Sequence, residues 1–404
     1  MMLRDASNIT STHRRILMAT TLGWIFDFYD FVLFTYLMIP MSKQLHFTTG
    51  QTAEAIALSL MFTGLGGIFF GFVSDKIGRK PTLIITITLY SIGGILMMFT
   101  HTYGWMIFAR AVTGFGVGGE WGVGQSLLAE TVPAKLRGRF GAVMHSGLSV
   151  GIILAYIVGA FVAPHIGWRF TFGTAFIALL IVLPVLFSIP ESDVWQNRGT
   201  GKIARVPLRL VFEGKTPWFA LAALILMTLE FTGYWLLTTW FPTYLQTQRH
   251  MTIGHSALWL ILLNIGGFLG YTSTGFIADR YGRRKVLAVY KIIEAAAVIP
   301  ITLFWTGNTA VLLICMFFIG FGGGGTAVVG PIFNEVFPGP VRSTLSNSVF
   351  NIGRGLTFFM PLVVAALAAT VGFGTLLSTA SIFFVVMAIL VWAFPETRGK
   401  VLTD

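Results

Sequence analysis

The sequence predicts an all-α integral membrane protein whose twelve transmembrane helices form two pseudo-symmetric bundles of six. The apolar composition, and a set of motifs that occurs once in each half, lead to this prediction. Of the 404 residues, 55% are hydrophobic and 11% are charged, whereas about a quarter of the residues of a soluble domain are charged. A chain with so few charges must bury most of its length in lipid.

Twelve apolar stretches are long enough to cross a membrane, since a spanning helix needs about 20 mostly apolar residues. The first stretch follows Arg15 and is longer than the apolar segment of a signal peptide, so we expect it to be a retained helix. The predicted helices cover residues 16–40, 53–73, 81–100, 105–128, 138–164, 168–189, 217–245, 256–278, 286–306, 308–332, 344–369 and 372–394.

The basic residues lie mainly on one side of the predicted membrane. The net charge is +11, but twenty-one of the 27 Lys and Arg residues fall at the two termini or in the loops on the same side as the termini. The positive-inside rule places this side in the cytoplasm. We therefore expect a multi-pass protein of the plasma membrane with cytoplasmic termini, and the positive charge does not indicate a nucleic-acid partner.

The two halves of the chain repeat one another at an offset of about 205 residues. The stretch 71–80 (GFVSDKIGRK) recurs as 275–284 (GFIADRYGRR), and glycine-rich stretches that begin at Gly114 and Gly320 follow in the same order. Repeated bundles are typical of secondary transporters.

The repeat also predicts the domain boundaries. We expect an N-terminal bundle over residues 1–190, a polar cytoplasmic linker over 191–216 and a C-terminal bundle over 217–404.

The repeated loop motif (GxxxDxxGRK/R) resembles the signature of the major facilitator superfamily. Two further motifs point to particular families within this superfamily. They are residues 27–31 (DFYDF) in the first helix, and residues 110–114 followed by 118–122 (GGEWG) in the fourth. Together these motifs are similar to the sialate/lactate–proton symporter family and to the neighbouring metabolite–proton symporters. The resemblance implies a twelve-helix transporter that binds a small solute between its halves and exposes it alternately to the two sides.

Ionisable residues in the predicted spans need a reason, because a charge at the bilayer centre costs about 2.5–3.5 kcal/mol. Asp27 and Asp30 lie three residues apart on one face of the first helix, and two carboxylates so close do not both ionise readily. The likeness to sugar porters, where the matching pair is tied to proton coupling, implies that Asp30 faces Arg110 of the fourth helix. We assign proton coupling to these three residues; a purely structural salt bridge is the alternative.

Two more carboxylates belong to the predicted proton-coupling set. Glu120 lies in the fourth helix, and Glu230 in the seventh matches the position of Asp27 in the other half. Each carries either a proton or a hydrogen bond that holds neighbouring helices. Lys291 and Glu294 in the ninth helix are expected to be a peripheral pair whose charged ends reach toward the membrane surface.

Arg354 is the expected substrate anchor. It lies about ten residues into the eleventh helix, and the sequence places no acidic residue within four positions of it. A guanidinium presents a planar pair of donors that matches a carboxylate. We therefore expect Arg354 to bind a substrate carboxylate beside Asn351; a salt bridge to Glu230 or to an aspartate of the first helix is the alternative.

Further polar side chains are candidates for the wall of the substrate site. His145 in the fifth helix can carry a proton or bind a backbone carbonyl. Asn264 in the eighth helix, Tyr29 in the first and Tyr234 in the seventh are the other candidates, although aromatic residues more often serve packing.

The repeated loops carry Asp75 and Arg79 in the first half and Asp279 and Arg283 in the second. Each aspartate stands at the end of a helix, where a carboxylate is unfavourable against the helix dipole and needs a cationic partner. We expect these loops to act as gates whose contacts form in one conformation and break in the other; a static structural contact is the alternative.

The remaining motifs argue against other functions. The glycines of residues 114–119 fit the dinucleotide pattern GxGxxG, but they lie within a predicted span, where small residues let helices pack closely. Cys315 is the single cysteine, which leaves no disulfide. The sequence contains no nucleophile or metal motif, so we expect no enzyme, catalytic residue, metal site or cofactor.

The leading interpretation is proton-coupled symport of a small organic anion, with a monocarboxylate such as lactate or pyruvate as the expected substrate. The partners are then the anion, a proton and the surrounding lipid, and we expect the protein to act as a monomer. Symport of sialate, a dicarboxylate or a zwitterion is the nearest alternative. A sugar porter is less favoured, because a buried arginine without a partner is costly for a neutral ligand, and a channel would need a continuous pore.

Overall fold

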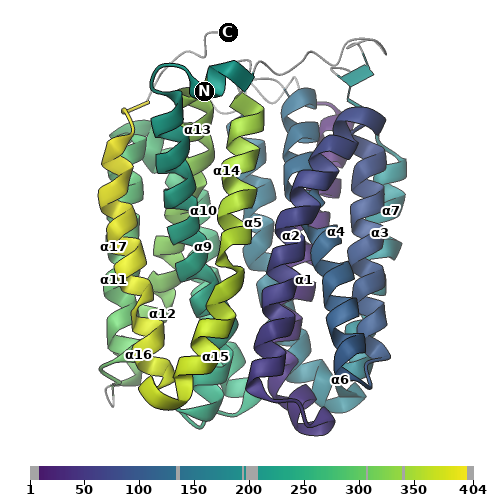
Figure 1. The fold of residues 1–404 in the computed structure, drawn as a ribbon, viewed down its shortest axis with the longest axis vertical. Coiled ribbons are helices and arrows are strands. Elements are labelled where there is room, and N and C mark those ends of the chain that lie inside the picture. The colour runs from purple at the N-terminus through teal and green to yellow at the C-terminus, as the bar shows by residue number, and fades with distance from the viewer. Residues whose placement is uncertain are drawn as a thin grey trace.

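The computed structural model describes residues 9–132, 137–192, 195–196, 208–305, 308–338 and 342–397. Within these ranges the chain forms long helices that run side by side, with both chain ends at the face drawn at the top of Figure 1. We call this the terminal face, and the other end of the bundle the opposite face. The predicted linker over residues 191–216 lies largely outside the described residues.

Each half contains six spans, so the predicted twelve-helix architecture is confirmed over the described part of the chain. The first half comprises α1 (Ser11–Leu45), α2 (Thr49–Ile77), α3 (Arg79–Met98), α4 (Tyr103–Thr131), α5 (Arg137–Ile157), α6 (Ala163–Gly173) and α7 (Phe176–Phe187). The second half comprises α9 (Thr216–Thr247), α10 (Ile253–Tyr281), α11 (Arg283–Thr302), α12 (Thr309–Gly323), α13 (Val329–Val336), α14 (Arg342–Leu356), α15 (Met360–Val371), α16 (Phe373–Ser378) and α17 (Ala380–Leu390).

Several spans consist of more than one helical segment. A π-helical turn (Val158–Val162) joins α5 to the start of α6, and Gly167, with φ of 79°, ends that span within α6. Short 3₁₀ turns join α12 to α13 (Gly324–Val328) and α14 to α15 (Thr357–Phe359). The last span runs through α16 and α17 to a final 3₁₀ turn (Val391–Ala393).

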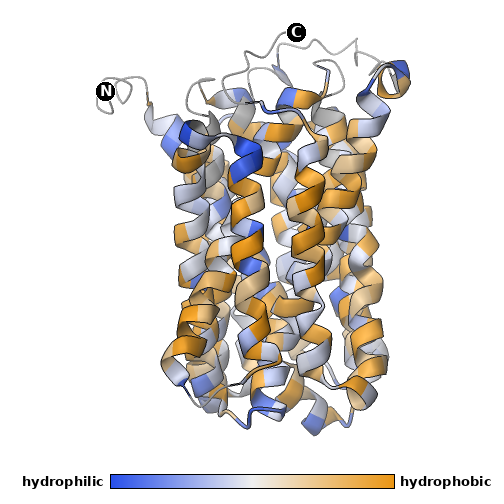
Figure 2. Ribbon diagram, turned by 90° about the vertical axis from the view of Figure 1, so that its left-hand side faces the viewer, coloured by the Kyte–Doolittle hydropathy of each residue, from blue (hydrophilic) through white to orange (hydrophobic). Residues whose placement is uncertain are grey.

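The outer surface of the bundle is apolar. Large side chains such as Phe72, Phe170 and Ile389 are exposed on it, and in Figure 2 hydrophobic residues dominate the middle of the helices while hydrophilic ones gather at the two ends. Nine helical segments of the described chain are long and apolar enough to cross a membrane. Such a surface is stable in lipid, where helices satisfy their own backbone hydrogen bonds.

The turns between helices repeat from one half to the other. Three pairs of residues with positive φ lie at matching positions: His46 (56°) and His250 (53°), Gly78 (105°) and Gly282 (97°), and Gly167 (79°) and Gly372 (84°). The helix caps repeat as well, because Thr48 and Thr252 each accept a hydrogen bond, of 3.2 Å, from the third residue of the helix that follows. The internal repeat of the sequence is therefore a repeat of backbone geometry.

The glycine-rich stretches pack closely against neighbouring helices, as the sequence predicted. A β-carbon on Gly114 of α4 would lie 2.3 Å from the carbonyl oxygen of Ser59 on α2. In the second half, a β-carbon on Gly320 of α12 would lie 1.7 Å from the carbonyl oxygen of Leu263 on α10. Both distances are too short for any side chain, so these glycines set the helix spacing within each bundle.

The two halves meet along α1 and α9, along α5 and α10, and along α2 and the α14–α15 span. The ring of Trp235 on α9 lies parallel to Phe28 of α1 (6.2 Å, 4°) and 4.3 Å from Phe31. Near the opposite face, the Tyr36 hydroxyl of α1 donates a hydrogen bond to the carbonyl of Ile253 on α10. Aromatic side chains of α1 and α9 thus form one part of the seam between the halves.

Candidate functional site

A central cavity lies between the two halves. The free space between its lining atoms, including the part that opens outward, is about 410 Å³. Residues from α1, α5, α9, α10, α14 and the 3₁₀ turn after α12 line it. The lining residues are Trp24, Phe28, His145, Leu148, Met227, Glu230, Phe231, Tyr234, Tyr271, Thr326, Phe350 and Arg354. Of the residues predicted from the sequence, the cavity brings together Arg354, Glu230, His145 and Tyr234.

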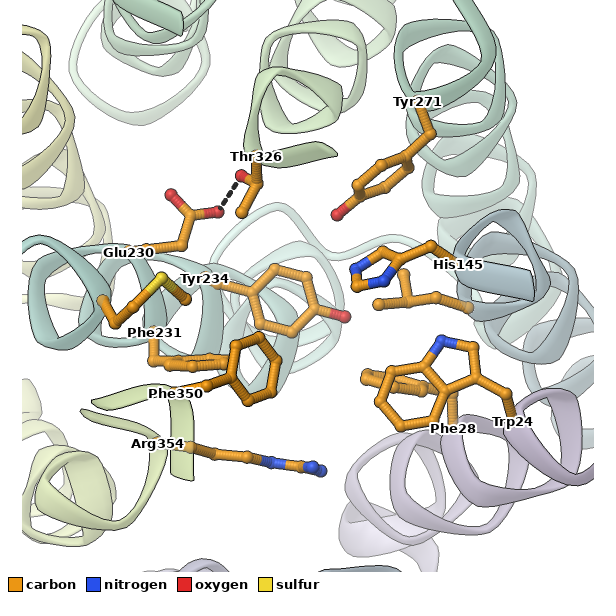
Figure 3. Close-up of a pocket in the computed structure, with 12 residues that line it drawn as sticks. Trp24, Phe28, His145, Glu230, Phe231, Tyr234, Tyr271, Thr326, Phe350 and Arg354 are labelled. Atoms are coloured by element: carbon orange, nitrogen blue, oxygen red, sulfur yellow. Dashed lines mark hydrogen bonds between the residues drawn. The ribbon is translucent and has the colours of Figure 1, made fainter. Parts of the chain in front are cut away.

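The polar groups of the cavity face one another across an aromatic wall. Tyr234, Tyr271 and His145 point toward a common space from α9, α10 and α5, and Arg354 extends from α14 toward Phe28 of α1 (Figure 3). The imidazole of His145 lies 5.3 Å from the Tyr271 ring, and its Nδ1 accepts a 3.5 Å hydrogen bond from the Trp121 indole. These groups can form hydrogen bonds with a small ligand.

Arg354 is a buried cation on the cavity wall. Its guanidinium lies 5.9 Å from the ring centre of Phe28 and 5.7 Å from that of Trp235. Its Nε and Nη2 atoms donate to no group in the described part of the chain. Two hydrogen-bond donors of a charged group are therefore available to a ligand, and the alternative of a direct salt bridge to Glu230 or Asp27 is not formed among the described residues.

Asp27 is a buried anion just behind this wall. It lies on α1 between the lining residues Trp24 and Phe28, without lining the cavity itself, and it is 0% exposed. Neither of its oxygens accepts a hydrogen bond from the residues that the structure describes. Its charge interacts with those of Arg354 and Asp30, so Arg354 is a counter-charge without a hydrogen bond.

Glu120 on α4 is a second such carboxylate. It is 0% exposed, its charge interacts with that of Asp27, and neither oxygen has a hydrogen-bond partner within the described ranges. Gly23 of α1 makes room for it, because a β-carbon there would lie 2.0 Å from Oε1 of Glu120. The glycine thus brings this carboxylate against α1, near Asp27.

Asp30 and Arg110 form the ion pair that the sequence predicted. Arg110 Nη1 lies 3.1 Å from Asp30 Oδ2, and its Nε donates to Ser59 at 3.0 Å. The guanidinium also lies 4.4 Å from the ring centre of Phe34. The pair is fully buried within the first half, and it holds α1 against α4.

In the second half, a buried lysine joins two carboxylates. Lys291 Nζ lies 2.6 Å from Glu230 Oε2 and 2.7 Å from Glu294 Oε2, and Thr326 donates to the other oxygen of Glu230 at 2.6 Å. The expectation of a peripheral pair at the membrane surface was wrong for Lys291 and Glu294. Lys291 is 0% exposed, because α11 turns this face toward α9 and not toward lipid.

A second cavity adjoins the first. The free space between its lining atoms, including the part that opens outward, is about 560 Å³. It shares Leu148, Tyr234 and Tyr271 with the central cavity. Asn264 and Glu294 line it, so the predicted role of Asn264 concerns this second space. On α9 its lining residues are further along the helix than those of the central cavity, which places it nearer the opposite face.

Two of the predicted substrate-binding residues lie outside both cavities. Tyr29 of α1 is hydrogen-bonded to Thr174 at the end of α6, within the first half. Asn351 lies one turn before Arg354 on α14, where its side chain packs against Gly67 of α2. Neither position supports direct contact with a ligand in the central cavity.

The predicted gating arginines contact carboxylates of their own half. The Arg79 guanidinium lies 3.0 Å from Glu130, and the backbone N–H of Arg79 donates a hydrogen bond to Glu191 at 3.1 Å. The second half repeats both contacts. The Arg283 guanidinium lies 2.8 Å from Glu335, and the backbone N–H of Arg283 donates a hydrogen bond to Glu396 at 3.0 Å. The side chains of Asp75 and Asp279 lie outside the described residues, and gating by these loops stays a prediction.

Sequence reasoning missed Thr326, Tyr271 and Phe350, which forms an aromatic pair with Trp121. The two rings of the pair stack across the halves, 3.8 Å apart and 8° from parallel. Tyr271 could have been found, since it lies seven residues after Asn264 and therefore on the same face of α10. Phe350 carries no comparable signal in a chain with 37 phenylalanines.

Family models decide the identity of the fold. Residues 20–274 match the model described as Major Facilitator Superfamily, and residues 226–400 match that described as Sugar (and other) transporter. The chain belongs to the Major Facilitator Superfamily. As a member of this superfamily it is a multi-pass membrane transporter and not an enzyme.

Other major facilitator proteins match over nearly the whole chain. The chain is 28% identical to a probable 4-methylmuconolactone transporter of Cupriavidus pinatubonensis, over 93% of this chain and 89% of the relative. It is 26% identical to the sialic acid transporter NanX of Escherichia coli, over 97% and 96%. The predicted likeness to carboxylate and metabolite transporters is thereby confirmed.

Solved structures match the fold. The partially occluded inward open conformation of the xylose transporter XylE from E. coli superposes with a TM-score of 0.79 at 19% identity, covering 97% of this chain and 100% of XylE. At this identity the likeness concerns the fold alone.

Proposed function

We propose that this transporter is a proton-coupled symporter that carries one small organic monocarboxylate with one proton by alternating access. The observation that carries the proposal is the arrangement of Arg354 and Asp27. The buried guanidinium of Arg354, with two available donors, lies on the cavity wall. The buried carboxylate of Asp27 lies behind this wall and interacts electrostatically with the guanidinium.

A substrate carboxylate competes with Asp27 for this counter-charge. A bidentate pair with a carboxylate is the strongest contact that a guanidinium makes. Once Arg354 is neutralised by the substrate, an ionised Asp27 would be a buried charge without compensation, which is costly. Asp27 therefore takes up a proton when the anion binds, and it gives the proton up when the anion leaves.

The other acidic groups support this exchange. Glu120 lies close enough to Asp27 for their charges to interact, so we assign it the role of a neighbouring proton site. We also assign the Asp30–Arg110 pair to proton coupling, as the resemblance to sugar porters implies. One anion with one proton carries no net charge and avoids the cost of about 2.3 kcal/mol per charge per 100 mV of membrane potential.

The wall of the cavity favours a substrate with a flat ring or conjugated chain. Six aromatic side chains line it in addition to His145, and such rings stack on flat ligands. Relatives include proteins named for transport of benzoate and of cis,cis-muconate, both in Acinetobacter baylyi. Lactate and pyruvate, the substrates expected from the sequence, are smaller monocarboxylates without a ring. Sialate, dicarboxylates such as muconate, or zwitterions remain the alternatives.

Hydrogen bonds from the cavity wall would orient the bound acid. We assign this role to His145 and Tyr234, whose polar ends point into the cavity (Figure 3). Asn264 would contact the substrate on its way through the second cavity. The distribution of basic residues supports a plasma-membrane location with the terminal face in the cytoplasm.

The proposal is tested by uptake into proteoliposomes. Labelled lactate, pyruvate, benzoate and nicotinate are offered with and without an imposed pH gradient. We expect saturable uptake of at least one acid, faster with the gradient and abolished by an uncoupler. Uptake that ignores the gradient would contradict proton coupling.

The role of Arg354 is tested by substitution. Removing a charge-assisted pair worth about 1.5–3 kcal/mol should raise the apparent KM of Arg354→Ala by about 10- to 150-fold. Arg209→Ala is the matched control, because this arginine is 89% exposed and pairs only at the surface with Glu213. An unchanged KM in Arg354→Ala would remove Arg354 from the substrate site.

A further inference from the structure

The buried lysine of the second half connects the two cavities. Glu230 lines the central cavity and Glu294 lines the second cavity. Lys291 lies between them, with its ammonium within 2.6 Å of the first carboxylate and 2.7 Å of the other. An ammonium carries three N–H groups and can contact both carboxylates at once. The three side chains, which we call the lysine bridge, form a continuous chain of two ion pairs from one cavity to the other.

The charges of the lysine bridge do not balance. Two carboxylates and one ammonium sum to one negative charge, and a surplus charge is costly in a buried site. The groups that face the bridge are Tyr234, one turn after Glu230 on α9, Tyr271 of α10, Thr326, and Phe384 of α17, whose ring centre lies 5.1 Å from Lys291 Nζ. None of these is a cation, and Arg354 forms no ion pair with Glu230 in the described part of the chain. One proton on either carboxylate would neutralise the bridge.

The second cavity offers a polar route to Glu294. Ser149, Tyr156 and Asn264 line it together with apolar residues. The Ser149 hydroxyl is buried and bonds to none of the described residues, so it is available to water. The cavity lies toward the opposite face, where a symporter with cytoplasmic termini meets protons from outside.

We propose that Lys291 relays protons between the two cavities. Glu294 takes up a proton from the second cavity. The ammonium of Lys291 then gives one of its protons to the Glu230 carboxylate and receives one from the Glu294 carboxylic acid. The lysine ends as an ammonium, Glu294 as a carboxylate and Glu230 as an acid at the central cavity. The relay rests on the proposed proton symport and names residues that deliver its proton.

The relay is tested by separating proton movement from substrate movement. Glu294→Gln keeps a group that can accept a hydrogen bond from Lys291 but cannot carry a proton. Glu213→Gln is the matched control, because Glu213 lies at the surface. Wild type and variants are reconstituted, with labelled benzoate as the probe, or whichever of lactate, pyruvate and nicotinate the wild type carries fastest. Two rates are measured: exchange of labelled for unlabelled acid at equal pH, and net uptake driven by a pH gradient.

We expect Glu294→Gln to exchange substrate within about twofold of the wild-type rate. Its net uptake should fall by about 100-fold, the lower end of what a positioned proton-transfer group contributes. Glu213→Gln should match the wild type in both assays, as surface substitutions do.

Two results would overturn the relay while leaving symport intact. Glu294→Gln with wild-type net uptake would show that protons reach the site without it. Equal loss of exchange and net uptake would assign Glu294 a structural role. A wild-type protein that ignores the pH gradient would instead contradict the proposed function, and the relay with it.

Discussion

Each half of the transporter buries a carboxylate on its first helix, and the partners of these carboxylates differ. Glu230 of α9 forms an ion pair with Lys291 and accepts a hydrogen bond from Thr326. Asp27 of α1 accepts none from the described residues, and its neighbour is Glu120, another acid. The second half therefore fixes its carboxylate by direct contacts. In the first half, the counter-charge of Asp27 is Arg354, the residue that we propose binds the substrate carboxylate.

The comparison predicts that the lysine is the most sensitive position for stability. Lys291→Met would leave Glu230 and Glu294 buried without their cation, at a cost of about 3–5 kcal/mol. We expect the variant to unfold at much lower temperature or to fail to accumulate, as measured by thermal melting in detergent. Lys291→Arg, which keeps the charge, is the control. A Lys291→Met protein as stable as the wild type would mean that the contacts of Glu230 contribute little.

Asp27→Asn should have the opposite profile. The substitution removes a buried charge and breaks no hydrogen bond that the structure describes, so stability should stay within about 1 kcal/mol of the wild type. Net uptake driven by a pH gradient should fall by about 100-fold, because the group that takes up the proton is gone. Substrate exchange at equal pH should persist. Persistence of pH-driven uptake would move the coupling site to another carboxylate, with Glu120 tested next.

Thr326→Val tests a weaker contact of Glu230, and its effect on stability should be smaller than that of Lys291→Met. The hydroxyl donates one hydrogen bond to Glu230 at 2.6 Å, and hydrogen bonds to charged groups contribute about 1.5–3 kcal/mol. We expect a measurable drop in melting temperature, smaller than that of Lys291→Met. Thr326→Ser is the control because it keeps the hydroxyl. Equal melting of the valine and serine variants would show that Thr326 does not stabilise Glu230.

The smallest effect is expected at the stacked pair that joins the halves. Phe350→Leu would remove the aromatic contact with Trp121, worth about 0.5–1.5 kcal/mol. The halves should then separate more readily at this point, with a change of about two- to tenfold in the labelling rate of a cysteine introduced beside Trp121. Phe350→Tyr, which keeps the ring, should label at the wild-type rate. An unchanged rate in Phe350→Leu would exclude this stack as a barrier between the halves.

The fold could be predicted from the sequence because its signals are redundant. Apolar length, the side of the membrane on which basic residues lie, and the repeat of the motif at residues 71–80 each predict the same twelve spans. Parts of the site could be predicted because a charge in an apolar span is rare. Arg354, Glu230 and the Asp30–Arg110 pair stand out for this reason.

The rest of the site depends on helix orientation, which the sequence does not determine. Lys291 and Glu294 were misjudged because their partner, Glu230, lies about sixty positions earlier, on a helix whose approach to α11 cannot be read from either segment. Tyr29 was misplaced for a related reason. Two residues along a helix turn the side chain by about 200°, so Tyr29 points away from the side of α1 that Asp27 presents to Arg354.

The matched turns bear on how the molecule arose. The glycines Gly78 and Gly282, with positive φ of 105° and 97°, connect equivalent helices in two halves that otherwise share few interior charges. Duplication of an ancestral six-helix unit explains the shared turns, and divergence after duplication explains the different acids. The backbone bends have persisted because each is dictated locally by one residue. The interior charges were free to diverge, so that the first half keeps Asp27 without a hydrogen bond from the described residues while the second half carries Arg354 on the cavity wall.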